Sequence, residues 1–425
     1  MITLHKPKRP TKIIQFGGGV FLRGFFDWML QKANDEGIYN GNAVIIRSKT
    51  GGRDPLEEQC FNYTHLARDA SHNDITLIDS IAGSINAQDS YEEFLALVEC
   101  ADTDVIVSNT TEAGIVYEKC DFPSDACPLS FPAKLTALLL RRFEGGLGGM
   151  LIIPCELIEK NADKLKEIVL NHARDWELSE EFCRFVSEEC SFRNTLVDRI
   201  VSGKPNGELD LGYEDKNANT SEYFHLFVIE GEPDCRLPLD RLGLVRYVPS
   251  VDPFRTIKVR ILNGAHTSMI PYALLSGVET VRECLENEKI SAHLENCLSE
   301  IKASLDLDKD EVEEYAEQVK KRFANPYIHH RCESIALNSV SKFKVRVLPS
   351  ILAYEKKFNK APSSLLCAFG KLIRLYKENA PSDSEMAIDK LKNGTVLEIL
   401  SDVSLWGEDL SRFANEVESY ANSSK

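Results

Sequence analysis

A short apolar strand that runs into three consecutive glycines constrains the fold of this chain most. Residues 11–16 predict a buried strand, residues 17–19 are all glycine, and residues 20 to about 33 have the spacing of a helix. Glycines at such a turn let a ligand approach the backbone, and the following helix offers free N–H groups to a phosphate. This order favours a dinucleotide site, although Leu22 replaces the third glycine of the usual pattern. A glycine turn without a ligand is the alternative.

The length and the distribution of patterns predict two domains. A chain of 425 residues exceeds the size of one typical core. Further buried strands are expected at 43–47, 104–108 and 150–155, and residues 222–230 also have the pattern of a strand. After residue 254 helical spacing dominates, most clearly in 285–305 and 309–323. We therefore expect an α/β, Rossmann-like domain at 1–250 and a mostly α-helical domain at 251–425.

Charge and cysteine usage narrow the possible partners and the compartment. The net charge of −16 argues against nucleic acid and anionic membranes as partners. No apolar run approaches the ~18 residues of a membrane span, and no signal peptide is recognised. The 12 cysteines are scattered without a CxxC pair, which is typical of reduced thiols in a cytoplasmic protein and predicts no metal site. The oligomeric state is not predicted.

Three polar residues just after the expected domain boundary form the main catalytic candidate. Lys258, Asn263 and His266 follow one another at spacings of five and three. On an α-helix, at ~100° per residue, Asn263 lies about 140° and His266 about 80° round from Lys258, on one broad face. A lysine can exchange a proton with an alcohol oxygen, and an amide can stabilise charge on that oxygen. The alternative is a hairpin turn at Asn263-Gly264.

This spacing resembles the signature of the polyol-specific long-chain dehydrogenases, the mannitol dehydrogenase family. The stretch 258–277 is similar to the branch that reduces D-tagaturonate to D-altronate, and the resemblance recurs along nearly the whole chain. It implies an NAD-dependent oxidoreductase whose active site lies in the cleft between the domains. Lys258 would be the general acid or base, Asn263 would polarise the carbonyl, and His266 would orient both. A free lysine titrates near ~10.4, so burial and neighbours such as Arg255 or Arg260 are expected to lower that value.

The resemblance also implies cofactor contacts. The family pattern Gly-x-Gly-x-Phe-x-Arg is matched by Gly17, Gly19, Phe21 and Arg23. Arg23 would face the cofactor phosphates or the active site, or else be a solvated helix charge. The loop 109–114 matches the family's Thr-Glu-x-Gly element, in which Thr111 and Glu112 would contact the nicotinamide half; a capping turn is the alternative. The resemblance implies NAD, but the basic stretch 47–53 precedes the first acid, Asp54, and leaves NADP open.

The remaining candidates concern the substrate. Many relatives have Cys-Asp-Asn where this chain has Cys155-Glu156-Leu157, so the second oxyanion donor of those relatives is absent at Leu157. For Glu156, proton transfer, helix capping and ribose binding all stay open. Asp198 lies in a Val-Asp-Arg-Ile stretch that borders the active site in the family; a structural Asp–Arg pair is the alternative. Basic groups suit a substrate carboxylate, or else lie solvated on a helix; the candidates are His330, Lys342 and Arg346.

Three other functions remain as rivals. Two are sibling activities of the same family, fructuronate reduction and mannitol-type polyol oxidation. Relatives that oxidise polyols have an arginine at about the position of Ser334, where this chain has a serine. The third is a nucleotide-binding sensor that keeps the fold without turnover, which the intact Lys258, Asn263 and His266 disfavour.

Overall fold

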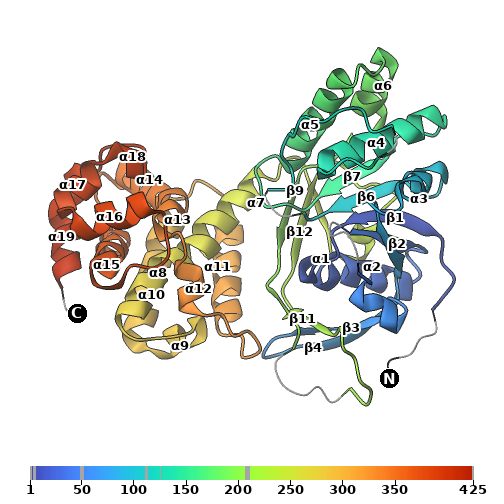
Figure 1. Cartoon of the computed structure of the whole chain (residues 1–425). Coiled ribbons are helices and arrows are strands. Elements are labelled where there is room, and N and C mark those ends of the chain that lie inside the picture. The colour runs from blue at the N-terminus through green and yellow to red at the C-terminus, as the bar shows by residue number, and fades with distance from the viewer. Residues whose placement is uncertain are drawn as a thin grey trace. The chain divides into compact units, whose positions relative to one another are not determined.

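The computed structural model describes residue 2 and residues 6–47, 52–110, 113–124, 126–205 and 211–423. The chain divides into two compact units, Met1–Val251 and Asp252–Lys425. Figure 1 shows strands and helices together in the first unit and helices alone in the second. This architecture confirms the expected fold class, an α/β Rossmann-like domain followed by a helical one.

A six-stranded parallel sheet organises the first unit. Its order is β5-β2-β1-β6-β7-β8, so the sequence runs outward from β1 in one direction and then from β6 in the other. In open α/β sheets a ligand binds at the carboxyl ends of the strands where this order reverses, here between β1 and β6. The strands are β1 (Thr11–Phe16), β2 (Asn42–Arg47), β5 (Ile81–Asn86), β6 (Val105–Ser108), β7 (Leu151–Pro154) and β8 (Ser191–Phe192).

Helices cover the sheet and complete its two cores. The helix expected at 20–33 is broken at Phe25, whose φ of −125° and ψ of −76° are not helical. Phe25 is fully buried, with its ring 5.2 Å from that of Phe227, so tertiary packing overrides the helical pattern there. The helices are α1 (Val20–Gly24), α2 (Phe26–Asp35), α3 (Tyr91–Ala96), α4 (Phe131–Glu144), α5 (Asn161–Asp175) and α6 (Glu180–Arg184).

Two smaller sheets belong to the same unit, in the orders β10-β11-β3-β4 and β13-β12-β9. The strand expected at 222–230 is two strands in different sheets, because the chain leaves β11 at Glu222 and begins β12 at Leu226. The strands are β3 (Tyr63–Arg68), β4 (Asn73–Ile78), β9 (Thr195–Asp198), β10 (Val201–Gly203), β11 (Asn219–Glu222), β12 (Leu226–Glu230) and β13 (Arg246–Val248).

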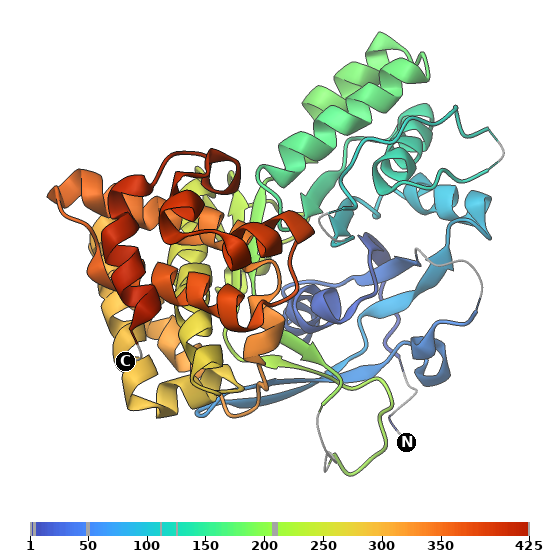
Figure 2. The same cartoon turned by 60° about the vertical axis from the view of Figure 1, so that its left-hand side comes forward.

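The second unit consists of packed helices (Figure 2). Its core includes α8 (Gly264–Leu275), most of whose residues are buried. The predicted helix 309–323 is confirmed as α11. The predicted helix 285–305 is divided at Asn287, whose side chain accepts hydrogen bonds from the backbone N–H groups of Lys289 and Ile290 and so begins a new helix. The helices around α8 are α7 (Asp252–Ile257), α9 (Val281–Glu286), α10 (Glu288–Ser304), α11 (Lys309–Phe323), α12 (Cys332–Ala336), α13 (Ser339–Arg346), α14 (Leu348–Phe358), α15 (Ser363–Asn379), α16 (Glu385–Asn393), α17 (Val396–Ser401), α18 (Val403–Trp406) and α19 (Ala414–Asn422).

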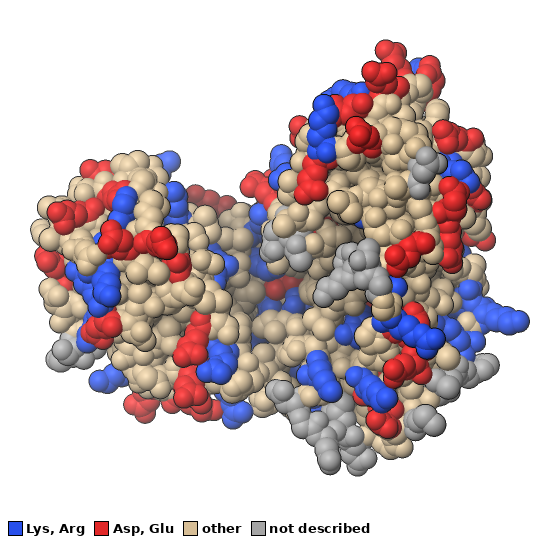
Figure 3. All heavy atoms as spheres, in the orientation of Figure 1, with Lys and Arg blue, Asp and Glu red and all other residues tan. Residues whose placement is uncertain are grey.

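The surface carries both signs of charge. On the face in Figure 3, acidic and basic side chains are interspersed over each unit. A small anionic ligand therefore has to find a local group of cations on a molecule whose net charge is −16. Among the described residues, none of the helices has the length and hydropathy to cross a membrane.

Candidate active site

The Lys258 segment is helical, but its geometry differs from the expected α-helix. Residues Lys258–Asn263 form a π-helical turn between α7 and α8. A π turn hydrogen-bonds residue i to residue i+5 and takes more residues than an α turn. Lys258 and Asn263 are five apart, so the π turn brings them closer to one line than the ~140° of an α-helix. The side chain of Lys258 is only 8% exposed.

The hairpin alternative at Asn263-Gly264 is wrong, because helix continues from the π turn through Gly264 into α8. The glycine serves close packing. A Cβ at Gly264 would lie 3.3 Å from the carbonyl oxygen of Arg346 and 3.4 Å from Cδ1 of Ile301. The absence of a side chain thus lets the end of α13 lie against the turn that carries Lys258 and Asn263.

His266 is held between two aromatic rings. It is buried in α8, with its ring stacked on Phe323 at a centroid distance of 4.1 Å. The ring of His330 meets it edge-on at 5.1 Å. The structure therefore brings His330 next to the His266 end of the predicted trio. Burial, with the positive charge of Arg322, lowers the pKa of His330, which favours a neutral ring at neutral pH.

Two further basic candidates lie on α13. Lys342 donates a hydrogen bond of 2.9 Å from Nζ to the carbonyl of Ile335. Burial, together with the charge of Arg346, lowers the pKa of Lys342, while Asp383 opposes that shift. Arg346 is largely buried, and burial lowers its pKa too. Both candidates are thus partly withdrawn from water, unlike the solvated helix charges of the alternative reading.

Of the two arginines expected to influence Lys258, Arg260 has side-chain hydrogen bonds that fix its direction. Arg260 donates from Nε to Ser350 Oγ at 2.6 Å and from Nη2 to Ser304 Oγ at 3.3 Å. These hydrogen bonds direct its guanidinium toward the end of α10 and the start of α14. Burial lowers the pKa of Arg260 to about 10. The lowering of the Lys258 pKa by Arg255 or Arg260 stays a prediction.

In the first unit, the glycine turn lies at the carboxyl end of β1. Gly17 has a φ of +113°, and a Cβ there would lie 2.7 Å from the carbonyl oxygen of Asn109. Gly19 is exposed, and a Cβ there would meet no atom within 4 Å. Gly17 thus permits a close contact between the loops after β1 and β6, while Gly19 leaves open space. This edge fits a dinucleotide, because a ligand backbone can approach it without meeting side chains.

The other two residues of the family pattern turn toward the protein. The ring of Phe21 stacks on Phe25 at 5.0 Å. The guanidinium of Arg23 lies 5.5 Å from the ring of Tyr63 and donates a weak 3.4 Å hydrogen bond from Nη1 to the carbonyl of Asn217. Arg23 is thus half-buried and in contact with β3 and with the segment that precedes β11. Its role toward a cofactor remains a prediction.

The loop after β6 is fixed by a residue whose role was left open. Glu156, two residues after the end of β7, is 2% exposed and accepts hydrogen bonds from Ser108 and Thr110. Thr111 and Glu112 lie outside the described residues. Leu157 is 52% exposed, and its side chain offers no donor in place of the absent asparagine.

The structure also describes the surroundings of two acidic residues named in the sequence analysis, Asp54 and Asp198. Asp54 caps a 3₁₀ turn by accepting from the backbone N–H of Leu56 at 3.0 Å, so its side chain is engaged locally. Asp198 is buried at the end of β9. The neighbouring Arg199 donates to the carbonyls of Glu222 and Gly24 and lies 4.2 Å from the Trp28 ring. The place of Asp198 at the active site, like the alternative of a structural pair with Arg199, stays a prediction.

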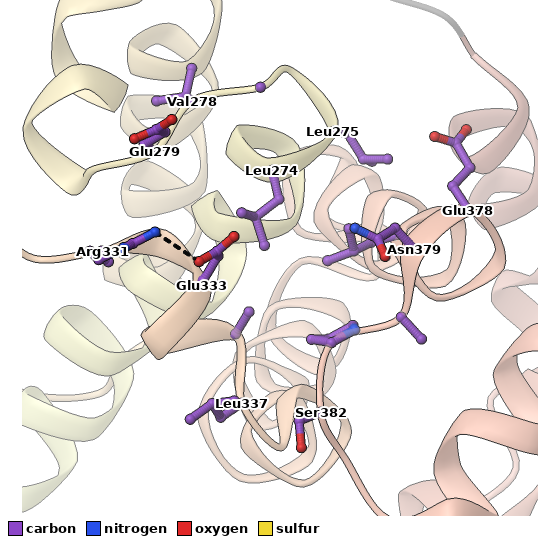
Figure 4. A pocket seen from close by; sticks show the side chains of 15 residues that line it. Leu274, Leu275, Val278, Glu279, Arg331, Glu333, Leu337, Glu378, Asn379 and Ser382 are labelled. Atoms are coloured by element: carbon purple, nitrogen blue, oxygen red, sulfur yellow. Dashed lines mark hydrogen bonds and ion pairs between the residues drawn. The ribbon is translucent and has the colours of Figure 1, made fainter.

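A separate pocket of about 540 Å³ opens in the helical unit between the ends of α8 and α15 and the start of α12 (Figure 4). Its lining includes Leu274 and Leu275 and the Arg331–Glu333 ion pair, whose atoms lie 3.0 Å apart. The pocket adjoins His330 through Arg331 but is not lined by the Lys258 trio. Within the described residues, no group of three or more potential metal ligands is found.

The fold and these two sites define a class: an oxidoreductase with a dinucleotide-binding Rossmann domain and a helical domain that carries a Lys-Asn-His set. The family models for the mannitol dehydrogenase Rossmann domain and the mannitol dehydrogenase C-terminal domain match residues 11–239 and 250–424. The chain belongs to the mannitol dehydrogenase family.

Curated relatives and solved structures agree with this membership. Proteins named altronate oxidoreductase from Yersinia enterocolitica and Escherichia coli O6:K15:H31 are each 39% identical, over 96% and 97% of this chain and 93% of theirs. A substrate-free D-sorbitol dehydrogenase matches with a TM-score of 0.81 at 19% identity, covering 97% of this chain and 92% of that one. Pseudomonas fluorescens mannitol 2-dehydrogenase, solved with NAD and D-mannitol, matches with 0.72 at 19% identity, covering 99% and 92%. These two structures support the fold.

Proposed function

We propose that this protein reduces D-tagaturonate to D-altronate, reversibly, in hexuronate catabolism. The observation that carries the proposal is the π-helical turn, which brings Lys258 and Asn263 closer to one line than an α-helix would and is followed by His266 in the first turn of α8. The chain is an NAD-dependent oxidoreductase of the mannitol dehydrogenase family that acts on a CH–OH group. The substrate is inferred from relatives named altronate oxidoreductase, which match along most of the chain.

The side chains of the trio supply acid–base chemistry. NADH, when bound, supplies the hydride that reduces the keto carbon. The ammonium of Lys258 donates a proton to the carbonyl oxygen as negative charge develops there. The Asn263 amide donates a hydrogen bond to the same oxygen and stabilises that charge. In the oxidising direction, neutral Lys258 takes the proton from the alcohol. His266, whose ring stacks on Phe323, orients the substrate and Lys258.

The sugar acid also needs a partner for its carboxylate. His330 is held neutral by burial, so it suits hydrogen bonds to hydroxyl groups rather than charge pairing. Lys342 and Arg346 are cations that are partly buried, where charge-assisted hydrogen bonds are strong. We assign the carboxylate to these two residues of α13 and the hydroxyls to His330.

Removing Lys258 tests the acid–base role. The Lys258→Ala variant is expected to lose at least about 10²-fold in kcat, because positioned proton transfer contributes roughly 10²–10⁴-fold. Its affinity for NADH, measured by fluorescence titration, should stay close to that of the wild type. The matched control is Lys289→Ala on α10, an exposed lysine whose loss should leave both quantities unchanged. Near-normal kcat in a folded Lys258→Ala protein would refute the assignment.

A further inference from the structure

The carboxylate of Glu156 is almost fully enclosed and bonded on both oxygens. Oε2 accepts from Ser108 Oγ at 2.9 Å, and Oε1 accepts at 2.9 Å from both the backbone N–H and Oγ1 of Thr110. Burial raises the pKa of this group, and the hydrogen bonds oppose that shift. A backbone N–H can only donate, so a buried acceptor opposite Thr110 is a structural requirement at this point.

These hydrogen bonds link the carboxyl ends of neighbouring strands. Glu156 follows β7, and its donors lie at the end of β6. The loop after β6 in turn contacts the loop after β1, because Asn109 N–H donates to the carbonyl of Phe16 at 2.9 Å. The Asn109 carbonyl oxygen also lies only 2.7 Å from the position that a Cβ of Gly17 would take. Glu156 therefore connects, through two residues, to the glycine turn at which the strand order reverses.

Both ends of this connection are fixed. On the β7 side, Asn161 Nδ2 donates to the carbonyls of Pro154 at 2.9 Å and Glu156 at 3.1 Å. On the β6 side, a Cβ at Gly114 would lie 1.9 Å from Thr110 Oγ1, so Gly114 packs directly against the hydroxyl that Glu156 holds. The rotamer of Thr110 is thus determined by a carboxylate on one side and a glycine on the other.

We propose that Glu156 is a positioning residue that holds Thr110, and through it the start of the loop after β6, in the conformation that receives the cofactor. The inference rests on the proposed use of NADH at this edge of the sheet. Because Ser108 and Thr110 already donate to both carboxylate oxygens, this role is favoured over proton transfer, helix capping and ribose binding.

Two variants at this position separate geometry from charge. Glu156→Ala leaves the buried donors of Ser108 and Thr110 without their acceptor, and the loop then has to be reordered when NADH binds. We expect its Kd for NADH, from fluorescence titration, to rise about 10-fold or more. Glu156→Gln keeps one oxygen for both donors of Thr110 and should restore Kd to within about 3-fold of the wild type. The matched control, Glu159→Gln, changes an exposed glutamate three residues further on and should have no effect.

A third variant keeps the test valid if Glu156→Ala fails to fold. Thr110→Val removes the hydroxyl donor and retains the backbone N–H. It should raise the Kd for NADH by itself. Where Glu156→Ala does fold, the Glu156→Ala/Thr110→Val double variant should bind NADH no worse than Glu156→Ala alone, as coupled residues do. The KM for the sugar acid should change less than the KM for NADH. A purely structural role would lower Tm without this selective effect.

The outcomes distinguish this inference from the proposed function. An unchanged Kd for NADH in folded Glu156→Ala and Thr110→Val proteins would overturn the positioning role of Glu156. It would not contradict the proposed reduction of D-tagaturonate. A wild-type protein that binds NADH but turns over no tagaturonate would instead refute the proposed substrate, and the Glu156 comparison could still be made by titration.

Discussion

At the scale of single residues, burial shifts the pKa of titratable groups and so makes stability depend on pH. Asp27 in α2 is fully buried, and burial raises its pKa to about 7, against the lowering effects of Tyr63, Arg23 and Gln15. The Tyr63 hydroxyl lies 3.0 Å from Asp27 Oδ2 and 2.9 Å from the Arg23 carbonyl. A protonated Asp27 can donate to the Tyr63 oxygen while Tyr63 donates to that carbonyl. The folded protein therefore retains a proton that the unfolded chain releases.

This proton predicts a pH dependence of stability. The unfolded chain loses the Asp27 proton near pH 3.8 and the folded protein only near pH 7, so Asp27 lowers the free energy of unfolding as pH rises through this window. The loss could reach about 4 kcal/mol at most. Asp27→Asn mimics the protonated form and should flatten the curve, measured by urea unfolding between pH 4 and pH 8. Parallel curves for variant and wild type would contradict the assignment.

Lys342 carries a second prediction at this scale. Replacing it with methionine should raise the KM for D-tagaturonate about 10-fold or more, because a charge-assisted hydrogen bond to the carboxylate is lost. Any turnover of neutral D-fructose should be affected much less. Lys344→Met on the same helix is the control, with Tm measured for both because Lys342 also bonds Ile335. An equal effect on charged and neutral substrates would remove Lys342 from the carboxylate site.

Sequence patterns identified several of these residues and missed the couplings between them. The spacing of Lys258, Asn263 and His266 placed them on one helical segment, but a one-dimensional pattern does not reveal that the turn is π-helical. His266 and His330 meet only because α11 and the segment before α12 fold back on α8. The hydrogen bonds of Glu156 join the ends of two strands far apart in the chain, so its role was not predictable from its neighbours.

At the scale of elements, two glycines of the turn after β1, Gly17 and Gly19, have different functions. Gly17 is needed by the fold, because its φ of +113° and its contact with the Asn109 carbonyl exclude a side chain. Gly19 has an ordinary φ of −68° and open space around it. We infer that Gly19 serves the ligand rather than the fold.

Alanine substitutions test this division. Gly17→Ala should lower Tm markedly, whereas Gly19→Ala should leave Tm unchanged and still raise the Kd for NADH, because the added methyl group occupies the space of the bound cofactor. Gly148→Ala serves as the control, since a Cβ there meets no atom within 4 Å and the residue precedes β7, away from the carboxyl ends of the strands. Unchanged NADH affinity in Gly19→Ala would show that the cofactor does not approach this turn.

Local sequence patterns were sufficient to predict some of the helices and strands. Residues 11–16 and 309–323 formed the expected strand and helix with their predicted bounds. The expected helix at 20–33 and the expected strand at 222–230 were each divided, in one case because Phe25 packs inward and in the other because the chain passes from one sheet to another. Those breaks depend on tertiary contacts that no local window contains.

At the scale of the whole molecule, the substrate poses the main question. A protein with a net charge of −16 that acts on an anionic sugar acid has to concentrate positive charge locally. In the helical unit the proposed cations are Lys258, which is buried, and Lys342 and Arg346, which are partly buried. The family alone fits neutral polyols and sugar acids alike, so these cations and the relatives named altronate oxidoreductase favour the sugar acid.

The proposed preference for D-tagaturonate can be measured from the initial rate of NADH oxidation, followed by absorbance. D-tagaturonate, D-fructuronate and D-fructose are compared at equal concentration. NADPH is tested in parallel, because the basic stretch 47–53 leaves NADP open. We predict rapid turnover with D-tagaturonate and NADH, and much slower rates with the other substrates and with NADPH. Preferential turnover of D-fructuronate or D-fructose would contradict the proposed substrate while leaving the role of Lys258 intact.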